Sequence, residues 1–292
     1  MEGIIKAVCI SEKRGTVKKN INEVNVIKDF GLEGDAHAGK WHRQVSFLSA
    51  DIVDEFNEKG ASVIEGDFGE NILAYGIDFK KLPVGTKLIC NDAKFEITQI
   101  GKECHSHCEI YKRVGDCIMP REGIFAKVLE SGTIKVGDKI EVIYPEKDMP
   151  YMAAVMTLSD KGSRGERVDT SGPRAAEILK EHGFKIVEEI ILPDEEAQIK
   201  KHLIRLSDSR QVDLIITTGG TGLSPRDRTP EATLAVADRN VPGISEAIRA
   251  GSMTITKRAM LSRGVSVIRK KTLIINPVSY THLRAHETLS DL

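Results

Sequence analysis

Cysteine is scarce in this chain, which has five cysteines among 292 residues. The number is odd, and three of the five lie between Cys104 and Cys117. A disulfide framework uses cysteines in pairs, so none is expected here. Because thiols stay reduced in the cytoplasm, this usage predicts a cytoplasmic protein.

The chain also lacks a long apolar run and an excess of charge of either sign. No apolar stretch is long enough to span a bilayer, and residues 1–6 lack the charged region and long apolar core of a signal peptide. The formal net charge is −1. We therefore expect no membrane insertion and no general attraction to nucleic acid. The length predicts about two domains.

Two common phosphate-binding signatures are missing as well. There is no G-x-x-x-x-G-K-[ST] and no G-x-G-x-x-G, so neither a Walker A loop nor a Rossmann fingerprint is present. Instead a β-branched run at residues 212–216, typical of a buried strand, leads into Gly219, Gly220 and Gly222. Such glycines let the backbone turn sharply and bring its N–H groups close to an anion.

The residues after these glycines add charge and the start of a helix. Arg226 and Arg228 suit phosphate, and Asp227 between them suits a Mg²⁺-dependent reaction of phosphates. Thr229 is a good N-cap, Pro230 suits the first helical position and Glu231 complements the helix dipole. The pattern predicts a phosphate-binding loop at a helix N-terminus, and its alternative is a tight strand–helix connection without a ligand.

The first half of the chain has the pattern of a β-rich domain. Short strands with turn residues between them are typical of a small barrel or a folded sheet. Phe47 to Lys59 alternates at helical spacing, and Gly60 would end that helix. The predicted strands are residues 3–10, 86–90, 94–100 and 139–143.

Two loops in this half carry residue types that could bind a ligand. A glycine-rich loop holds Asp35 and His37, with His42 following, and could build an anion or metal site or be a solvated loop. A second, glycine-punctuated acidic turn holds Glu70 and Asn71, and an ordinary loop is its alternative.

A cysteine–histidine cluster, Cys104-His-Ser-His-Cys108, precedes Cys117. Zinc is one ligand for such a cluster, but the spacing lacks a matching second half. A neighbouring imidazolium would lower a thiol pKa, so a reactive or sulfur-carrying cysteine is the better interpretation. Buried cysteines beside incidental histidines are the remaining alternative.

Together these segments resemble the MOSC domain, named for the C-terminal part of molybdenum-cofactor sulfurases. The resemblance covers residues 1–144 and implies a β-rich, barrel-like domain that handles molybdenum cofactor or cysteine-bound sulfur. The family's characteristic cysteine fits both Cys104 and Cys108. The segments that carry the resemblance are residues 34–39, 66–71, the cysteine cluster and residues 123–130. The cofactor-binding residues that it implies are Asp35, His37, Glu70 and Asn71.

The second half follows residues 145–151, which hold two prolines and predict a linker. Strands and helices then alternate, which predicts a three-layer α/β domain with a mostly parallel sheet. Ligands bind such sheets at the carboxyl ends of the strands, where the loops at residues 159–165, 193–195 and 219–231 fall. The predicted strands are 152–158, 184–192, 212–216 and 271–276, and the helices are 172–182, 193–206, 230–238 and one after Pro242.

Residues 152–276 resemble the molybdopterin adenylyltransferase family of molybdenum-cofactor biosynthesis. The resemblance implies that the terminal phosphate of molybdopterin attacks the α-phosphorus of MgATP and that pyrophosphate leaves. It also implies a homotrimer formed through this domain. The matching motifs are Leu158–Asp160, Asp169–Pro173, Leu192–Glu195, Thr217–Gly222, Arg226–Thr233, Val241–Gly243 and Leu261–Arg263.

The family's two key aspartates fall on Asp194 and Asp227, to which we assign metal binding and phosphate alignment. Asp194 has an alternative role as an acid at a helix N-terminus. The predicted phosphate cradle is Gly219, Gly220, Thr221 and Gly222. The other predicted binding residues, several of which could equally be structural, are Thr157, Ser159, Asp160, Arg226, Thr229, Pro230, Glu231, Glu246, Ser262 and Arg263.

Residues 277–292 match nothing in that family, and we interpret them as a foreign or frameshifted end. We consider two functions for the rest of the chain. The first is an adenylyltransferase joined to a MOSC domain, and the second is a non-catalytic carrier that delivers molybdopterin or finished cofactor to molybdate-insertion or molybdoenzyme partners. A third reading gives Cys104 or Cys108 a role in sulfur transfer.

Overall fold

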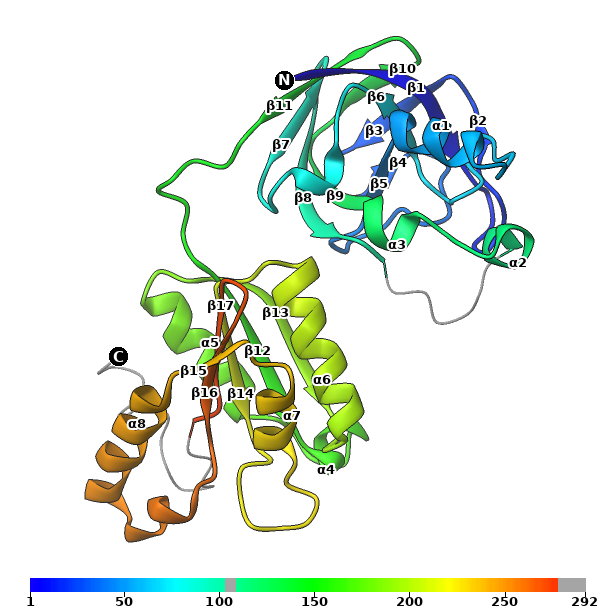
Figure 1. The fold of residues 1–292 in the computed structure, drawn as a ribbon. Helices are drawn as coiled ribbons and strands as arrows, with labels where there is room; N and C mark the ends of the chain where they lie inside the picture. Colours follow the sequence, from blue (N-terminus) through cyan, green and yellow to red (C-terminus); the bar gives the residue numbers. More distant parts are fainter. Residues whose placement is uncertain (103–108, 278–292) are drawn as a thin grey trace. The chain divides into compact units, whose positions relative to one another are not determined.

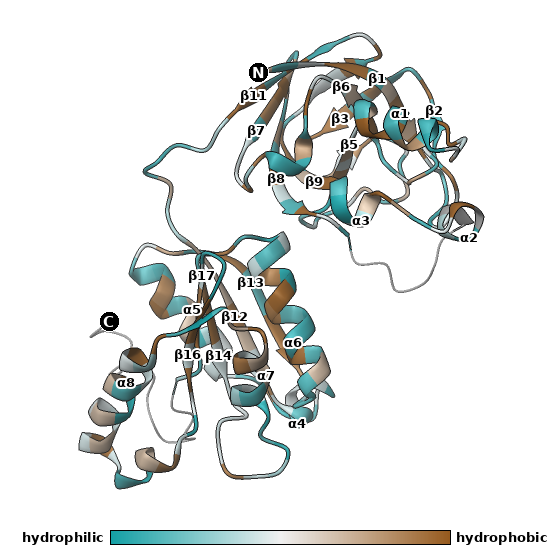
Figure 2. Cartoon of the chain, viewed as in Figure 1, coloured by the Kyte–Doolittle hydropathy of each residue, from teal (hydrophilic) through white to brown (hydrophobic). Residues whose placement is uncertain are grey.

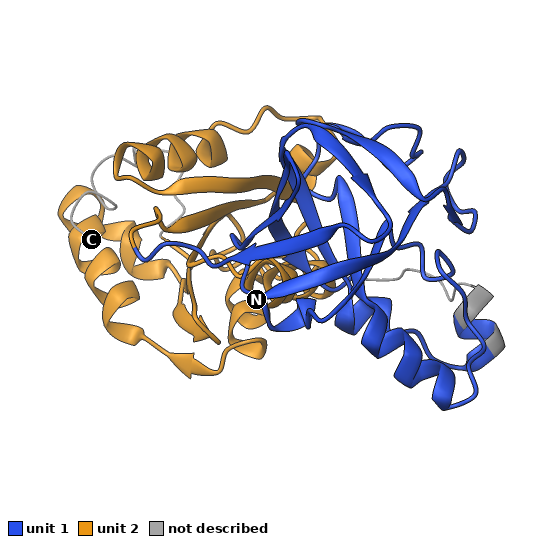
Figure 3. Cartoon of the chain, turned by 90° about the horizontal axis from the view of Figure 1, so that it is seen from above, with its two compact units in different colours: residues 1–147 blue, residues 148–292 orange. Residues whose placement is uncertain are grey.

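The computed structural model describes residues 1–102 and 109–277, traced in Figure 1. The chain divides into two compact units, Met1–Lys147 and Asp148–Leu292, which Figure 3 colours blue and orange. The division falls inside the linker predicted at residues 145–151. Apart from residue 277, the segment that we interpret as a foreign or frameshifted end lies outside the described residues.

The first unit is a closed barrel, as its short strands and turns predicted. Seven strands follow one another in the order β11-β7-β8-β9-β5-β6-β1, and a pairing between β1 and β11 closes the ring. Neighbouring strands run antiparallel except β5 and β6, and closure leaves no long sheet edge unpaired. The seven strands are β1 (Glu2–Ile10), β5 (Val45–Ser49), β6 (Ile72–Tyr75), β7 (Lys87–Cys90), β8 (Ala93–Ile100), β9 (Ile124–Glu130) and β11 (Lys139–Ile143).

Shorter elements complete this unit. The strand β2 extends the sheet beside β1, and a second sheet has the order β10-β3-β4. The helix α1 packs its buried Val53 and Phe56 in a cluster with residues of the barrel wall. These elements are β2 (Lys19–Asn20), β3 (Glu23–Ile27), β4 (Gly31–Leu32), β10 (Gly132–Lys135), α1 (Ala50–Glu58), α2 (Glu109–Val114), α3 (Met119–Glu122) and a 3₁₀ turn, Phe79–Lys81.

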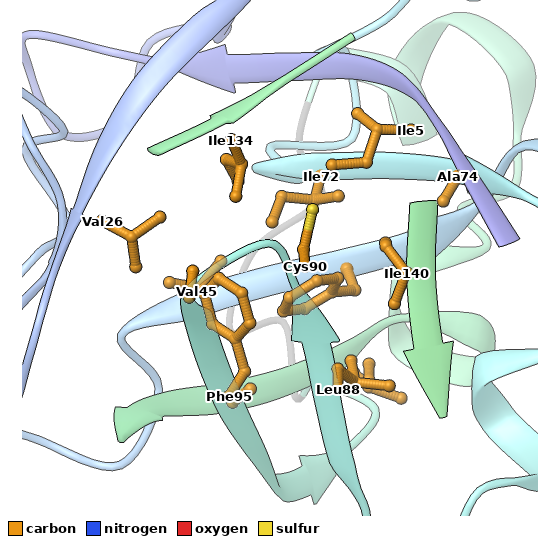
Figure 4. Packing of buried hydrophobic residues seen from close by; sticks show 14 of the residues in the cluster. Ile5, Val26, Val45, Ile72, Ala74, Leu88, Cys90, Phe95, Ile134 and Ile140 are labelled. Atoms are coloured by element: carbon orange, nitrogen blue, oxygen red, sulfur yellow. The ribbon is translucent and has the colours of Figure 1, made fainter. Parts of the chain in front are cut away.

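The barrel is filled by side chains from many strands, which Figure 4 shows pointing toward one another. Strands such as β3 and β11 alternate exposed and buried residues, the period of a strand with one wet face. Phe47 is fully buried, with its ring centroid 5.3 Å from that of Phe95 and 5.6 Å from that of Phe79. The interior is therefore a packed core, and any ligand site lies outside it.

The helix predicted from Phe47 to Lys59 begins later, at Ala50. The prediction was wrong there because β5 is buried at all five positions, and a strand buried on both faces loses the alternation that marks strands. The helix ends at Glu58, and Gly60 follows with a φ of +93°, as its position predicted.

The second unit contains a six-stranded sheet in the order β13-β12-β14-β17-β16-β15. Strands β13, β12, β14 and β17 are parallel, and β16 runs antiparallel to both β17 and β15. The sheet is therefore mixed: mostly parallel, as predicted, with an antiparallel edge that was not predicted. Its strands are β12 (Met152–Leu158), β13 (Lys185–Leu192), β14 (Leu214–Thr218), β15 (Arg239–Asn240), β16 (Ser266–Arg269) and β17 (Thr272–Ile275).

Helices cover both faces of this sheet, which gives the three layers that the sequence predicted. One core cluster joins the sheet to α6 and α7, and another joins it to α5 and α8. In Figure 2, α6 shows both colours, as a helix with one buried face should. The helices are α4 (Asp160–Ser163), α5 (Ser171–Glu181), α6 (Glu196–Ile204) with a π-helical turn at Arg205–Ser209, α7 (Thr229–Ala235), α8 (Pro242–Ile255) and a 3₁₀ turn, Lys257–Leu261. None of the described helices has the length and apolarity that a bilayer span requires.

Candidate functional site

Three loops of the second unit meet because three parallel strands end at the same level. In the register of β12 with its neighbours, Leu158 pairs with Leu192 of β13, and Thr157 pairs with Thr218 of β14. The loops that follow begin at Ser159, Pro193 and Gly219. The carboxyl edge of this sheet therefore brings together the three loops that the sequence placed there.

The glycine loop leaves β14 in a conformation that other residues rarely adopt. Gly219 and Gly220 have φ values of +94° and +64°. A Cβ on Gly219 would lie 2.2 Å from the carbonyl oxygen of Leu158, and one on Gly220 would lie 2.2 Å from Oγ1 of Thr229 and 2.9 Å from Oδ1 of Asp194. Glycine is required here because the backbone passes directly beside these groups.

Thr229 does not cap α7, contrary to the sequence prediction. It is the first residue of the helix, and Arg228 at the N-cap position makes no side-chain cap bond. The Thr229 hydroxyl instead donates to the carbonyl oxygen of Gly219 at 3.1 Å, and its amide donates to that of Gly220 at 3.2 Å. The residue thus ties the helix start to the glycine loop.

Asp160, Asp194 and Arg226 form a network across all three loops. The amide of Asp160 donates to Oδ2 of Asp194 at 3.2 Å, and the amide of Asp194 donates to Oδ1 of Asp160 at 3.1 Å. Arg226 donates to Asp160 through Nη2 at 2.7 Å and through Nε at 3.1 Å. Because the arginine side chain is 59% exposed, this ion pair adds little stability, and its effect is to position the groups.

Asp194 has the features of a carboxylate that would hold a cation. Burial raises its pKa, and the charges of Asp160 and Asp227 raise it further. Its Oδ1 is buried and accepts no hydrogen bond from the part of the chain that the structure describes. A cation beside Asp194 and Asp227 would satisfy this oxygen and offset their repulsion. The residues present therefore fit a magnesium ion.

The donor set is also the one that magnesium prefers. Magnesium is commonly held by one or two carboxylates together with substrate phosphates and water. Within residues 1–102 and 109–277, no three Asp, Glu, His or Cys side chains gather as a metal site of their own. Asp194 and Asp227 would thus hold the ion only jointly with a phosphate ligand, which suits a nucleotide-dependent reaction.

Arg263 holds the glycine loop against the 3₁₀ turn that follows α8. Its Nε donates to the carbonyl oxygen of Gly222 at 2.7 Å, and its amide donates to that of Thr221 at 3.0 Å. Its guanidinium also donates to the carbonyl oxygen of Asp227 and to the carboxylate of Glu231, on α7. Arg263 therefore holds the loop in place, and its guanidinium is committed to backbone carbonyl oxygens and to Glu231.

A small pocket of about 130 Å³ opens beside the glycine loop. Thr157, which lines it, donates through Oγ1 to Oδ2 of Asp169 at 2.6 Å and accepts from the hydroxyl of Thr218 at 3.3 Å. Asp169 also accepts from the amides of Ser171 and Gly172 at the start of α5. The sequence prediction did not include Asp169 or Thr218 among the site residues, although the Asp169–Pro173 motif was a signal for the first.

The other predicted residues of this unit have different surroundings. Ser159 caps α4 by accepting from the amide of Gly162 at 3.0 Å, and Pro230 is buried in the first turn of α7. Ser262 lines a separate pocket with Ser245, Arg249 and Arg263. Glu246 is exposed on α8 and is not part of the lining of that pocket.

In the first unit, Asp35 is the centre of a buried network. It accepts from the amide of Ser11 at 3.0 Å, from Nζ of Lys18 at 2.9 Å and from Nδ2 of Asn71 at 3.1 Å. Nδ1 of His37 lies 3.9 Å from Oδ1 of Asp35. Burial opposes ionisation, but His37 and Lys18 outweigh it and hold the Asp35 pKa well below its usual range. The structure thus joins three predicted residues and adds Lys18.

The fourth predicted residue, Glu70, lies apart from this network. Its Oε1 accepts from the amide of Gly66 at 2.7 Å, and its buried Oε2 accepts no hydrogen bond from any described residue. Burial raises the pKa of Glu70 to about 7. This acid therefore fits a structural role in the turn at residues 64–70 better than a ligand-binding role.

The raised pKa of Glu70 predicts a loss of stability as the pH rises. The folded protein keeps a proton that the unfolded chain releases near the ordinary pKa of 4.5, so the contribution is complete below that pH and is lost as the pH rises through about 7. The loss amounts to roughly 3 kcal/mol. In Glu70→Gln, urea unfolding of the first unit, followed by Trp41 fluorescence, should lose this pH dependence. An unchanged pH profile in the variant would rule out the assignment.

The predicted thiols Cys104 and Cys108 lie outside the described residues. Cys117, which follows this cluster in the sequence, is 7% exposed and lines a larger pocket with Lys18, His37 and Asn71. The structure therefore places Cys117 at the same pocket as three residues that contact Asp35.

Comparison with known proteins agrees with the division of the chain into two units. A probable molybdopterin binding domain matches residues 154–284, and the MOSC domain matches residues 34–141. The molybdopterin adenylyltransferase of Helicobacter pylori strain J99 is 43% identical over 124 residues, covering 42% of this chain and 70% of that protein. The Escherichia coli K12 protein of the same name is 43% identical over 125 residues, or 64% of its length.

Among solved structures, the molybdopterin biosynthesis enzyme MoaB of Thermus thermophilus has 46% sequence identity and a TM-score of 0.44, covering 48% of this chain and 87% of that one. The match to the probable molybdopterin binding domain falls in the second unit, and the MOSC match falls in the first. The chain therefore belongs to the molybdopterin adenylyltransferase family, and its first unit is similar to the MOSC domain.

Proposed function

We propose that the second unit adenylylates molybdopterin in molybdenum-cofactor biosynthesis. A terminal phosphate oxygen of molybdopterin attacks the α-phosphorus of ATP, the bond from that phosphorus to the bridging oxygen of the β-phosphate breaks, and pyrophosphate leaves. The observation that carries the proposal is the convergence of the strained glycine loop with Asp194 and Asp227 at the end of three parallel strands. The named activity of the relatives supports it.

The physical task is to bring two anions together. The amides of Gly219 to Gly222 bind the molybdopterin phosphate, since loop amides of this kind suit an anion. The side chain of Arg226 is largely exposed, so its guanidinium can turn from Asp160 to a phosphate. Asp194 and Asp227 would hold magnesium, which supplies charge neutralisation when bound. Arg263 keeps the loop in place.

Pyrophosphate release tests this proposal against its alternative. With molybdopterin, ATP and Mg²⁺, the enzyme should release pyrophosphate, and omission of molybdopterin should abolish it. A non-catalytic carrier would bind molybdopterin tightly and release none. The carrier remains the second candidate because Arg226 and Thr157 are already paired with Asp160 and Asp169 in the described structure.

The assembly and the partners also remain proposals. We propose a homotrimer formed through the second unit, supported by large apolar side chains that are exposed on α8 and the 3₁₀ turn after it. Light scattering of the purified chain would give the mass of the assembly. Molybdate-insertion proteins and molybdoenzymes are the proposed recipients of the product. The exposed side chains are Met253, Ile255, Met260 and Leu261.

For the first unit we propose binding of molybdenum cofactor or transfer of cysteine-bound sulfur. The match to the MOSC domain and the pocket that contains Cys117 support this. Mass spectrometry of the chain after exposure to a small-molecule persulfide, which transfers its outer sulfur and leaves as a thiol, would find a persulfide on Cys104, Cys108 or Cys117 if sulfur transfer is its role. The absence of a persulfide on all three would leave cofactor binding as the remaining function.

A further inference from the structure

The pocket of about 130 Å³ beside the glycine loop is too small to enclose a whole pterin or nucleoside. Pockets that enclose an organic ligand commonly measure about 300 to 1,000 Å³. Five of the eleven residues that line this pocket carry a hydroxyl group, so its wall suits a small polar group. The residues with hydroxyl groups are Thr157, Ser159, Thr170, Ser171 and Thr218.

Asp169 is the acid of this wall, and its two oxygens are already committed. Its Oδ1 accepts from the amides of Ser171 and Gly172 at 2.9 and 3.1 Å, and its Oδ2 accepts from the hydroxyl of Thr157 at 2.6 Å. A Cβ on Gly172 would lie 2.5 Å from both Oδ2 of Asp169 and Oγ1 of Thr157, so the carboxylate is held closely between α5 and β12. Asp169 therefore organises the wall and forms no ion pair with the described residues.

Arg167 is the cation of this wall, and its charge is not offset by a partner. Its exposed side chain makes no hydrogen bond or ion pair with any residue that the structure describes. In contrast, the arginines of the loops at residues 159–165 and 219–231 are all paired with acids. The charge of Arg167 is therefore available to a ligand in the pocket. The paired arginines are Arg164 with Glu166, Arg226 with Asp160 and Arg228 with Glu196.

The pocket adjoins one end of the glycine loop, and the two aspartates of the site lie against the rest of it. Gly219 belongs to the pocket wall. A Cβ on Gly220 would lie 2.9 Å from Oδ1 of Asp194, and one on Gly222 would lie 2.8 Å from Oδ2 of Asp227. In an in-line displacement the attacking and leaving oxygens lie on opposite sides of the phosphorus, so the leaving group needs a place of its own beside the loop. The pocket provides that place.

We propose that this pocket binds the β- and γ-phosphates of ATP and that Arg167 holds them as pyrophosphate leaves. The inference rests on the adenylyl transfer proposed above and names the residue that receives its leaving group. When the bond from the α-phosphorus to the bridging oxygen breaks, its electron pair stays on that oxygen, where negative charge develops. A guanidinium fork suits two phosphate oxygens and stabilises this charge as it forms.

Replacing Arg167 by alanine should lower kcat/KM for ATP at least about tenfold, because the transition state loses a charged donor to its leaving group. Arg167→Lys keeps the charge and should recover part of the loss. The Kd of molybdopterin should not change in either variant, since its phosphate binds the glycine loop. Arg164→Ala is the matched control and should keep the wild-type kcat/KM, because Arg164 is an exposed arginine of the same segment that pairs with Glu166 and lies outside the pocket wall.

Isothermal titration calorimetry of the full chain with pyrophosphate and Mg²⁺ tests the pocket without turnover. The wild type and Arg164→Ala should bind pyrophosphate equally, and Arg167→Ala should bind it at least about tenfold more weakly. If the wild type released no pyrophosphate in turnover, adenylyl transfer would be wrong, but this selective loss of affinity would still support a polyphosphate site at Arg167. The inference would be overturned by no pyrophosphate binding to the wild type, by equal affinity in Arg167→Ala, or by a loss of molybdopterin affinity in that variant with kcat/KM for ATP unchanged.

Discussion

Replacing Asp227 by asparagine is expected to lower kcat for pyrophosphate release by at least about a hundredfold while molybdopterin still binds. The carboxylate already accepts the amide of Ser224 at 2.9 Å, and an asparagine amide oxygen can accept the same bond. The loop should therefore keep its shape and lose only the charge. The test is steady-state pyrophosphate release together with equilibrium binding of molybdopterin.

Asp148→Asn is the control for this substitution, because Asp148 is exposed near the division between the units and lies outside the three loops. It should retain full activity. Full activity in Asp227→Asn would remove Asp227 from the mechanism. A loss of molybdopterin binding in that variant would instead assign the residue to binding of the pterin.

Gly219→Ala is expected to abolish activity and to destabilise the second unit by about 2 to 4 kcal/mol. The new Cβ would lie 2.2 Å from the carbonyl oxygen of Leu158, a backbone atom that cannot move aside without disturbing β12. The φ of +94° adds strain that alanine cannot avoid. Urea unfolding and the pyrophosphate assay measure the two effects.

Gly251→Ala provides the matched comparison. Gly251 lies in α8, and no heavy atom lies within 4 Å of the Cβ that alanine would add. Alanine in a helix is favoured over glycine by roughly 0.5 to 1 kcal/mol, so this variant should be as stable as the wild type or more so. If both glycine variants behaved alike, the close approach of the loop to β12 would not be a requirement of the site.

The architecture of the second unit was largely predictable because its pattern is local. The buried apolar strands and the capped helices each carry their signal within about a dozen residues. The antiparallel edge was missed because β16 and β17 are joined by a two-residue turn at Lys270-Lys271, with Lys270 at a φ of +50°. A turn of that kind usually shows Asn or Gly, and neither residue is present here.

The first unit was harder to predict because its barrel depends on pairings between distant segments. β1 pairs with β11 across more than a hundred residues, and no local pattern predicts the register between these two strands. The buried β5 was taken for the start of a helix for the same reason, since only its position between β6 and β9 makes it a strand.

The site shows the same division between local and long-range information. The glycine loop with Asp227, and Asp194 in the loop that follows β13, were identifiable because each lies in a compact motif beside a strand end. Lys18 was not, because nothing near it in sequence predicts that a lysine will be buried against Asp35, 17 residues away. Buried ion pairs are products of the tertiary structure, so sequence spacing alone does not show them.

Mass spectrometry of the product after a single turnover tests the central claim most directly. With molybdopterin, ATP and Mg²⁺, we predict a species carrying the mass of molybdopterin plus an adenylyl group, formed together with one equivalent of pyrophosphate. Recovery of unmodified molybdopterin, or of ADP and inorganic phosphate in place of AMP-bearing pterin and pyrophosphate, would contradict the account.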